Sequence, residues 1–474
     1  MSNKLPDINT QFPDWYQEVI QQAELADHAP VRGCMVVRPY GWAIWEHIKN
    51  TLDDRIKKTG HHNAAFPLLI PESFFKKEAE HVEGFAPELA VVTHAGGKEL
   101  EEPLVVRPTS ETIIHYMFAQ WIKSWRDLPL KINQWANVIR WEKRSRPFLR
   151  TTEFFWQEGH TAHETYQEAL EEAELMLQEY VNLCHNVLAI PVIAGIKSKK
   201  EKFPGAEKTM TFEGIMPDGK ALQMGTSHLL SQSFAHSFNM QFQDRNGQLA
   251  MPYLTSWGST TRLVGAVIMV HGDQKGLILP PKIAPIQIVI IPIFKAGQEK
   301  DAILTKVYEI KDQLAAQHIR VEIDDNEHKT PGAKFYHWEL KGVPFRLEIG
   351  PRDLAQNNVV IVNRLTGYKS VMAISELATK LPIMLDEFQA DLFARAHERQ
   401  NAVTHTGEKL INFGPIMSEH NGVYKTGWCQ RDECEEALRE YKATTRCLLP
   451  TKEFAECFNC ARQSLGDVLV AKAY

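Results

Sequence analysis

The chain has 474 residues, which is too many for one compact core, so its length predicts two to four domains. Hydrophobic residues make up 44% of the chain and charged residues 24%, a composition that excludes a disordered protein. The net charge of −6 does not indicate a polyanionic partner, so any nucleic-acid site must come from local clusters of basic residues.

The N-terminal residues and the apolar stretches argue against secretion and membrane insertion. The start, MSNKLPDINT, lacks the basic-then-apolar order of a signal peptide. The most apolar stretches, VGAVIMV (264–270) and IQIVIIPIF (286–294), are too short to cross a bilayer. We therefore expect a cytoplasmic protein with no membrane partner.

Residues 1–283 form the candidate catalytic domain, because short apolar strands alternate there with long helices and most of the Trp, Arg and His residues lie there. Within it, VIRWEKRSRPFLRTTEFFWQEGH (138–160) predicts a basic hairpin with a break at Pro147. Arg140 and Glu142 are separated by one residue, so on a strand both side chains would face one site. Such a turn can bind a nucleotide phosphate or an RNA end. Taken alone, an ordinary basic hairpin is the simpler explanation.

The segment TSWGSTTRLVGAVIMVHGD (255–273) predicts a polar, glycine-bearing turn that leads into an apolar helix, with Arg262 near the helix start. Backbone N–H groups and a guanidinium at that position can bind a polyphosphate. A buried helix is the simpler explanation for this segment alone. The presence of both segments in one chain is what indicates a nucleotide site.

Residues 284–395 predict a small α/β domain with a largely buried sheet, and Pro280, Pro281 and Pro285 mark its start. Its second helix is the best marked, with Thr330 expected as the N-cap, Pro331 at the first position and Gly342 just past the end. The expected elements are, in order, a strand at 286–294, a helix at 299–317, a strand at 320–325, a helix at 331–341, strands at 344–350 and 358–364, and a helix from 375.

Residues 396–474 form the expected third domain and hold five of the seven cysteines. In a reducing compartment, one C-x4-C pair and one C-x-x-C pair supply four thiolates for a structural Zn²⁺. The expected ligands are Cys429, Cys434, Cys457 and Cys460. Cys447, in an apolar context, is expected to be buried. Free cysteines without a metal are the alternative, and a zinc site of this type says little about function.

Several motifs resemble one enzyme family. RWE with PFLRTTEF resembles motif 2 of the class II aminoacyl-tRNA synthetases, the segment that ends at Arg262 resembles motif 3, and FPLLIPESF (66–74) with the helix before it is similar to motif 1. The small α/β domain is similar to the class IIa anticodon-binding domain. The zinc tail and the terminal AKAY are similar to the archaeal/eukaryotic-type branch of the prolyl-tRNA synthetases. Further motifs follow the order seen in that family: VVRPTSET (105–112), WQEGH (156–160), LQMGTSH (222–228) and HGDQKGLILPP (271–281).

The resemblance implies a fold and an activity. The catalytic domain would be an α+β domain built on an antiparallel sheet, followed by an α/β anticodon-binding domain and a small zinc-bearing C-terminal α/β domain. The protein would form a homodimer through the motif 1 region. It would activate L-proline with ATP and Mg²⁺ to prolyl-adenylate and transfer the prolyl group to the 3′ end of tRNA(Pro).

The resemblance also implies roles for the nucleotide-site residues. Arg140 would bridge the proline carboxylate and the α-phosphate of ATP, and Arg262 would lie on the γ-phosphate side. In-line attack on the α-phosphate needs aligned oxygens and spread charge rather than a covalent intermediate, which suits two guanidinium groups. The other residues implied for ATP are Glu142, Arg150, Thr151, Gln223, Thr226 and Thr260.

For proline, Thr109 and Glu111 resemble the loop that binds the ammonium group, while the residues implied around the ring are Phe85, Trp156, His160 and His228. A carboxylate suits the cation and aromatic faces suit the ring carbons. Such a pocket excludes smaller amino acids only weakly, so we expect measurable activation of alanine or cysteine. The roughly one hundred residues between motifs 2 and 3 are too few for an added editing domain.

Glu339, Arg346 and Lys369 are similar to residues that read the two guanines of proline anticodons, and a guanidinium matches guanine O6 and N7. A solvated edge of the α/β domain is the alternative for these residues. The last residue, Tyr474, resembles a terminal tyrosine that folds back with its carboxylate near the active site. Ser259 departs from the family pattern, in which a larger apolar residue is usual.

Two other classes of function remain open. A synthetase-like protein could activate an amino acid and load a different carrier, but the intact small α/β domain argues against it. A zinc-bearing RNA-binding protein without catalysis would have damaged ATP motifs. Arg140, Glu142 and Arg262 are all present, which argues against this second alternative.

Overall fold

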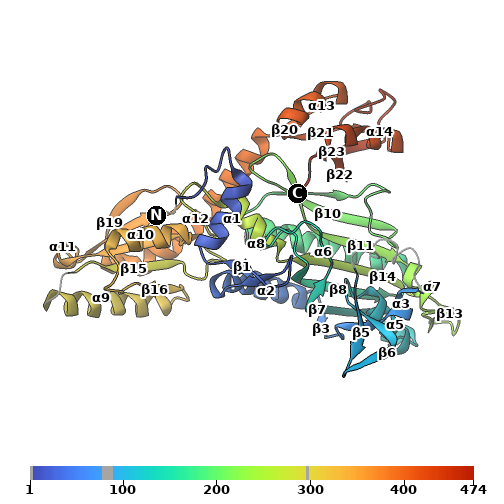
Figure 1. Ribbon diagram of the computed structural model, residues 1–474, viewed down its shortest axis with the longest axis horizontal. Coiled ribbons are helices and arrows are strands. Elements are labelled where there is room, and N and C mark those ends of the chain that lie inside the picture. The colour runs from blue at the N-terminus through green and yellow to red at the C-terminus, as the bar shows by residue number, and fades with distance from the viewer. Residues whose placement is uncertain (1–3, 77–88, 295–297) are drawn as a thin grey trace.

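The computed structural model describes residues 4–76, 89–294 and 298–474, and it arranges them as a central lobe with two further lobes attached (Figure 1). The central lobe contains the candidate catalytic domain. The small α/β domain lies at one end, and the cysteine-bearing C-terminal residues form the third lobe. In the part of the chain that is described, no helix is long and apolar enough to cross a bilayer.

An antiparallel sheet forms the centre of the candidate catalytic domain, as expected. Each of its six main strands is antiparallel to the next, and β3 (His62–Asn63) adds a short parallel edge beyond them. In spatial order the six are β9 (Val192–Ile196), β10 (Lys208–Ile215), β11 (Ala221–Ser231), β14 (Tyr253–Thr260), β8 (Glu153–His163) and β7 (Leu130–Ile139).

Helices cover this sheet and close its core. The long helix α6 (Tyr166–Asn186) packs on β10, β11 and β14. It begins at a capping box, in which the Thr165 hydroxyl accepts from the Glu168 N–H and the Glu168 carboxylate accepts from the Thr165 N–H. The packing is close, because a Cβ added at Gly159 would lie 2.0 Å from the Trp257 ring. Three further helices complete this core: α1 (Phe12–Gln22), α2 (Pro39–Lys58) and α8 (Arg262–His271).

The expected turn at residues 255–260 is wrong, because these residues belong to β14, a strand paired on both sides. The glycine and the polar residues of this strand are explained by the close packing of the neighbouring strands. A Cβ at Gly258 would lie 3.0 Å from the Gln157 carbonyl oxygen, so only glycine fits easily at that position. Ser259 is buried, and its hydroxyl donates to the Met224 carbonyl oxygen at 3.2 Å. This bond accounts for a polar residue where an apolar one was expected.

The expected hairpin is formed by β7 and β8. Arg140 and Glu142 were expected on one of its strands, but the strand ends before them. β7 ends at Ile139, so both residues lie in the connecting loop. The Arg140 N–H still donates to the Thr152 carbonyl oxygen at 2.8 Å, which continues the pairing by one residue. Loop geometry, rather than strand alternation, therefore sets the direction of these side chains.

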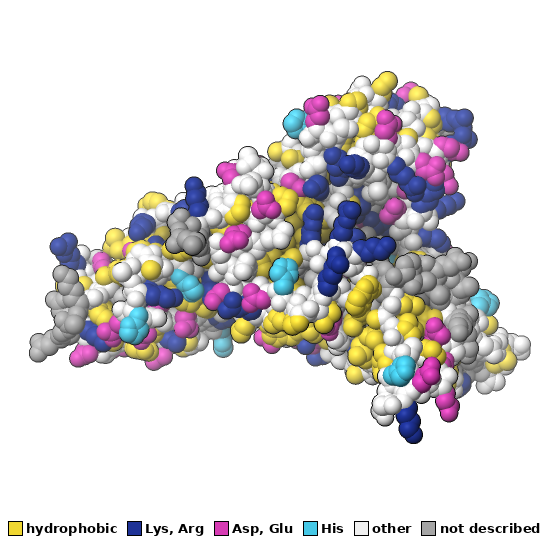
Figure 2. Space-filling view, in the orientation of Figure 1, with side chains coloured by type: hydrophobic (Ala, Val, Ile, Leu, Met, Phe, Trp, Pro, Cys, Tyr) yellow, Lys and Arg dark blue, Asp and Glu magenta, His cyan; other side chains and the backbone are white. Residues whose placement is uncertain are grey.

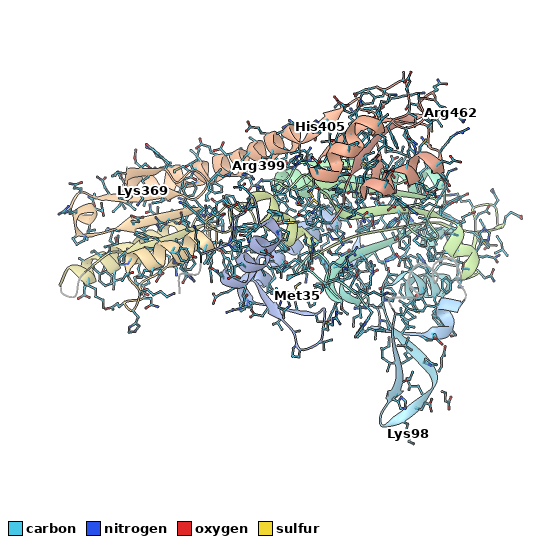
Figure 3. The ribbon with its side chains drawn as sticks, turned by 45° about the horizontal axis from the view of Figure 1, so that its top comes forward. Met35, Lys98, Lys369, Arg399, His405 and Arg462 are labelled. Atoms are coloured by element: carbon cyan, nitrogen blue, oxygen red, sulfur yellow. The ribbon has the colours of Figure 1, made fainter. Side chains whose placement is uncertain are left out.

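The remaining elements of the central lobe are short. A three-stranded sheet in the order β4–β6–β5 projects from the lobe, with Lys98 at its tip (Figure 3). The residues between β8 and β14 are all described, and they form elements of this lobe rather than a separate domain. The short elements are β1 (Ala26–His28), β2 (Met35–Val37), β4 (Leu69–Pro71), α3 (Glu72–Lys76), β5 (Ala90–Ala95), β6 (Lys98–Val106), α5 (Glu111–Trp121), η2 (Trp125–Asp127), α7 (Ser233–Ser237), β12 (Phe242–Gln243) and β13 (Leu249–Ala250).

The small α/β domain has the expected elements in the expected order, with one additional strand and two additional short helical segments, α11 (Pro351–Ala355) and η3 (Ile374–Glu376). The expected cap is confirmed, because the Thr330 hydroxyl accepts from the Ala333 N–H at 3.3 Å and Gly342 follows the helix with φ of 71°. The additional strand is β19 (Lys369–Ala373), the edge of a five-stranded sheet in the order β16–β15–β17–β18–β19. The other elements are β15 (Ile288–Pro292), α9 (Gln298–Ala315), β16 (Val321–Ile323), α10 (Pro331–Leu340), β17 (Phe345–Ile349) and β18 (Asn358–Asn363).

The helix α12 (Leu377–Ala402) connects the α/β domain to the C-terminal lobe, so the expected boundary at 395/396 lies inside it (Figure 1). Arg399 on this helix donates to the Val270 carbonyl oxygen at the end of α8. The strands of the C-terminal lobe extend the central sheet, because Leu448 of β22 pairs with Ile196 of β9. The elements are β20 (Thr404–Thr406), α13 (Leu410–Glu419), β21 (Val423–Trp428), α14 (Asp432–Glu436), η4 (Ala437–Tyr441), β22 (Thr444–Leu448) and β23 (Gly466–Ala471).

Candidate active site and metal site

A cavity of about 300 Å³ lies on the central sheet, and thirteen of the fourteen residues expected to bind ATP or proline line it. Phe85, the fourteenth, lies outside the described residues. Residues more than 150 positions apart in the chain, such as Thr109 and Arg262, therefore meet at one site. The thirteen are Thr109, Glu111, Arg140, Glu142, Arg150, Thr151, Trp156, His160, Gln223, Thr226, His228, Thr260 and Arg262.

Backbone carbonyl groups hold the two expected catalytic arginines in place. Arg140 Nε donates to the Pro108 carbonyl oxygen at 3.0 Å, and its guanidinium lies 5.6 Å from the centre of the Trp156 ring. Arg262 Nε donates to the Leu149 carbonyl oxygen at 3.0 Å, and its Nη1 donates to that of Gln223 at 2.8 Å. Backbone carbonyl oxygens thus help to fix both guanidinium groups in the cavity.

The charge around Arg262 is positive. Burial, and then the neighbouring guanidinium groups of Arg150 and Arg140, lower its pKa to about 10, while Glu213 opposes them. A pKa of this size still leaves Arg262 protonated at neutral pH. Glu142 lies 3.6 Å from Arg150 and offsets part of the positive charge. The cavity is therefore suited to a ligand with several negative charges, such as a polyphosphate.

A second group of residues that line the cavity is suited to a small cationic ligand with an apolar body. Thr109 donates to the buried Glu111 carboxylate, and Trp156 forms part of the wall. His228 accepts or donates hydrogen bonds with Thr209 and Thr226 at 3.0 and 2.9 Å. Burial, and less strongly His160, lower the pKa of His228 to about 3, so this imidazole is neutral at physiological pH.

Glu158 is a buried residue of the site that the sequence motifs did not single out. Burial would raise the pKa of its carboxyl group, but hydrogen bonds with His160, Ser110 and Gln134 bring it below the ordinary value. The distance to His160 Nε2 is 3.1 Å. Alternation on β8 could have found Glu158, because Trp156, Glu158 and His160 are two residues apart and all three line the cavity.

The four expected metal ligands come together in the C-terminal lobe. The sulfur atoms of Cys429, Cys434, Cys457 and Cys460 all lie within 4.8 Å of one another. The Sγ–Sγ distances from Cys429 are 3.7 Å to Cys434 and 3.6 Å to Cys460. A tetrahedral zinc ion with bonds of about 2.3 Å to sulfur needs separations of about 3.8 Å. The donor set and its spacing therefore fit Zn²⁺. Cys447 is fully buried outside the cluster, as expected.

Backbone N–H groups prepare this cluster for a cation. Burial would raise the pKa of the Cys457 thiol, but the N–H groups of Cys460, Asn459 and Cys429 lower it to about 7. A thiolate is the form that binds a metal. At least one ligand is therefore close to its binding state at neutral pH before any metal arrives.

The three expected anticodon residues are divided between two groups. Arg346 and Lys369 lie 2.8 and 3.5 Å from the same carboxylate, that of Glu348, on neighbouring parts of the five-stranded sheet. Lys369 is at the outer end of this domain (Figure 3). Glu339 lies on α10 and pairs with Lys275 of the central lobe at 2.9 Å.

Tyr474 packs beside the loop that carries the basic residues. Its hydroxyl donates to the Asp218 carboxylate at 2.8 Å, and its ring centre lies 5.6 Å from the Arg146 guanidinium and 5.0 Å from Lys220 Nζ. Figure 2 shows Lys and Arg side chains gathered where the central and C-terminal lobes meet. Burial, and then the charges of Lys220 and Lys442, lower the pKa of Lys472. A positive surface therefore lies near the C-terminus.

Comparisons with known proteins match almost the whole chain. Residues 92–271 match the tRNA synthetase class II core domain (G, H, P, S and T), residues 287–382 the anticodon binding domain, and residues 411–474 the prolyl-tRNA synthetase C-terminal domain. Proline–tRNA ligase 2 of Clostridioides difficile is 50% identical, covering 98% of this chain and 96% of the relative. Proline–tRNA ligase of Acetoanaerobium sticklandii is 49% identical, covering 99% and 98%.

Solved structures agree with these matches. Prolyl-tRNA synthetase from Cryptosporidium parvum, in a complex with halofuginone and AMPPNP, has a TM-score of 0.95 and 41% identity over 100% of both chains. The same protein with L-proline and AMP has a TM-score of 0.93 and 40% identity over 99% of both chains.

For the cysteine cluster, we expect about one zinc ion per chain in freshly purified protein and loss of that zinc in the Cys457→Ser variant. Three remaining thiolates cannot close the site. Elemental analysis by mass spectrometry measures the ratio, and Cys34→Ser, a change outside the cluster, is the matched control. Freshly purified protein without zinc, or a Cys457→Ser variant with full zinc, would refute the four-thiolate site.

Proposed function

This chain belongs to the class II prolyl-tRNA synthetase family, and on that premise we propose which of its residues carry out the reaction. The enzyme activates L-proline with ATP to prolyl-adenylate and transfers the prolyl group to tRNA. The observation that carries the proposal is that Arg140 and Arg262 line one cavity.

Arg140 and Arg262 are the proposed catalytic residues. Arg140, stacked near Trp156, contacts both the proline carboxylate and the α-phosphate, so it holds two anions together that would otherwise repel each other. Arg262 binds on the γ-phosphate side. Both guanidinium groups line the cavity, so each can stabilise the negative charge that develops on the α-phosphate and on the pyrophosphate leaving group.

The other cavity residues position ATP. Glu142, Arg150, Thr151, Gln223, Thr226 and Thr260 surround the same space and supply carboxylate, guanidinium, hydroxyl and amide groups for the base, ribose and phosphates. The carboxylate and hydroxyl oxygens among them suit Mg²⁺, and Gln223 and Thr226 lie where they would contact the ion or the nucleotide. When bound with ATP, Mg²⁺ neutralises phosphate charge.

The proline site follows from charge and shape. Glu111, with Thr109 hydrogen-bonded to it, accepts the protons of the secondary ammonium. Trp156, His160 and His228 enclose the ring, and Phe85 is the fourth residue proposed there. His228 is suited to this position because its low pKa keeps it neutral, so it adds no charge that would repel the ammonium.

We assign binding of the anticodon to the α/β domain at residues 284–395. Arg346 and Lys369 both contact the Glu348 carboxylate, so their N–H donors lie close together on the sheet. Such a pair of donors suits the acceptor atoms of guanine. Glu339 is the third residue proposed. The positive surface near Tyr474 supports contact with the tRNA backbone, and the terminal carboxylate is proposed to lie near the active site.

The remaining proposals concern assembly and location. A homodimer through the motif 1 region is supported by hydrophobic side chains that are 40 to 46% exposed near β4 and the β5–β6 hairpin, namely Leu68, Leu69, Val91 and Trp121. Sedimentation velocity on the purified chain tests it. The catalytic domain spans residues 1–283 and the zinc-binding domain residues 396–474. A thiolate site persists in a reducing compartment, which supports the cytoplasm.

Pyrophosphate exchange with each of the twenty amino acids tests the substrate. We expect proline to give by far the fastest exchange, with alanine or cysteine measurable but slower, because a few missing methylene groups cost a small pocket only about 1–3 kcal/mol each. Exchange led by any other amino acid would overturn the substrate assignment.

The Arg140→Ala variant tests the catalytic role. Its exchange rate should fall by about 100-fold or more, since a preorganised charge on the reacting phosphate is lost. Arg245→Ala is the matched control, because Arg245 is an exposed arginine paired with Glu164 away from the cavity. Circular dichroism should show both variants folded. Near-normal exchange in a folded Arg140→Ala protein would remove this residue from its role.

The Arg346→Ala variant separates anticodon binding from activation. Loss of one base contact should reduce tRNA charging by about ten- to 100-fold while exchange without tRNA stays unchanged. Arg352→Ala, an exposed arginine of the same domain, should leave both reactions intact. Unchanged charging by Arg346→Ala would show that this side chain does not read the anticodon.

A further inference from the structure

The C-terminal lobe supplies one charged side chain to the inside of the central lobe. Arg446 on β22 is 6% exposed, and its Nη2 and Nε donate to Glu213 Oε2 at 2.8 and 3.1 Å. Glu213 on β10 is fully buried, and Lys197 Nζ lies 2.9 Å from its other oxygen. Arg446 therefore forms a two-pronged ion pair across the boundary between the lobes.

This ion pair lies beside the nucleotide site, because Glu213 is on the same face of β10 as Thr211 and the cavity-lining Thr209. Glu213 is the partner of Gln223 in the β10–β11 pairing, and the ladder has an irregularity between Phe212 and Glu213. The Gln223 carbonyl oxygen accepts from Arg262 Nη1 at 2.8 Å. A chain of three contacts thus leads from Arg446 through Glu213 and Gln223 to the guanidinium of Arg262.

The charges of the same residues act on Arg262. Glu213 raises the pKa of Arg262, whereas Arg150, Arg140 and Arg446 lower it. Glu213 is therefore a counter-charge beside a strongly positive cavity. Its buried carboxylate is tolerable only while cations are paired with it, so Arg446 and Lys197 determine where it lies.

We propose that Arg446 is a positioning residue for ATP. It holds Glu213, and with it the β10–β11 pair, in the place where the Gln223 carbonyl directs Arg262 toward the phosphates. The proposal rests on the role given to Arg262 above. It assigns the C-terminal lobe a part in nucleotide binding that is separate from its cysteine cluster. Of the residues proposed for proline, His228 lies on β11, but Glu111, Trp156 and His160 lie on α5 and β8, so binding of proline depends less on this contact chain.

Steady-state pyrophosphate exchange on the full chain tests this. In Arg446→Met, the KM for ATP should rise about tenfold, kcat should fall, and the KM for proline should stay within about twofold, as expected for a coupling transmitted through neighbouring contacts. Arg446→Lys restores the positive charge and should recover part of the loss. Lys425→Ala, which breaks a surface pair with Glu453 in the same lobe, should behave as wild type.

Zinc content and thermal melting establish that the variants are folded. If Arg446→Met does not fold, Glu213→Gln takes its place, because loss of the counter-charge should give the same defect toward ATP. Wild-type ATP kinetics in the folded variant would overturn the proposal. An equal rise in the KM for ATP and for proline would also overturn the proposal, because it would indicate that the whole cavity has become less ordered.

Arg262→Ala, measured in parallel, separates this inference from the proposed function. An inactive Arg262→Ala protein beside a normal Arg446→Met protein would refute only the positioning role. A fully active Arg262→Ala protein would refute the role of Arg262 itself, and the inference would fall with it.

Discussion

Like charges held together in one cavity are the constraint on which the rest of this structure depends. Arg140, Arg150 and Arg262 repel one another, and Arg262 carries a lowered pKa as a result of burial and of these neighbours. Glu142, 3.6 Å from Arg150, offsets part of this charge, and the free protein must still hold the arginines in place. Backbone carbonyl groups do this, since those of Pro108, Leu149 and Gln223 accept from the guanidinium groups and carry no net charge. Bound phosphates then supply the missing negative charge.

Those three carbonyl groups come from different parts of the chain, so the site exists only when the fold is complete. Pro108 precedes α5, Leu149 lies in the loop of the β7–β8 hairpin, and Gln223 belongs to β11. The C-terminal lobe adds β22 to the edge of the same sheet and brings Arg446 to Glu213. The nucleotide site and the cysteine-bearing lobe therefore share one continuous sheet, whereas the α/β domain has a five-stranded sheet of its own.

The sequence predicted the structure correctly where residues close together in the chain determine it. The cap at Thr330, the cysteine spacing and the order of elements in the α/β domain are of this kind. Tertiary contacts decided the rest. Residues 255–260 read as a turn but form β14, because Gly258 lies against the Gln157 carbonyl. Alternation on β8 could have indicated Glu158, but its contact with Ser110 and the pairing of Leu448 with Ile196 join residues distant in sequence, which no local pattern reveals.

A crystal structure of this chain with L-proline and a non-hydrolysable ATP analogue would measure most directly whether the two arginines act together. We expect the guanidinium groups of Arg140 and Arg262 to donate hydrogen bonds to phosphates of the same nucleotide, with the proline carboxylate beside Arg140. A nucleotide contacted by only one of these two side chains, or bound outside the cavity that they line, would contradict this explanation of the site.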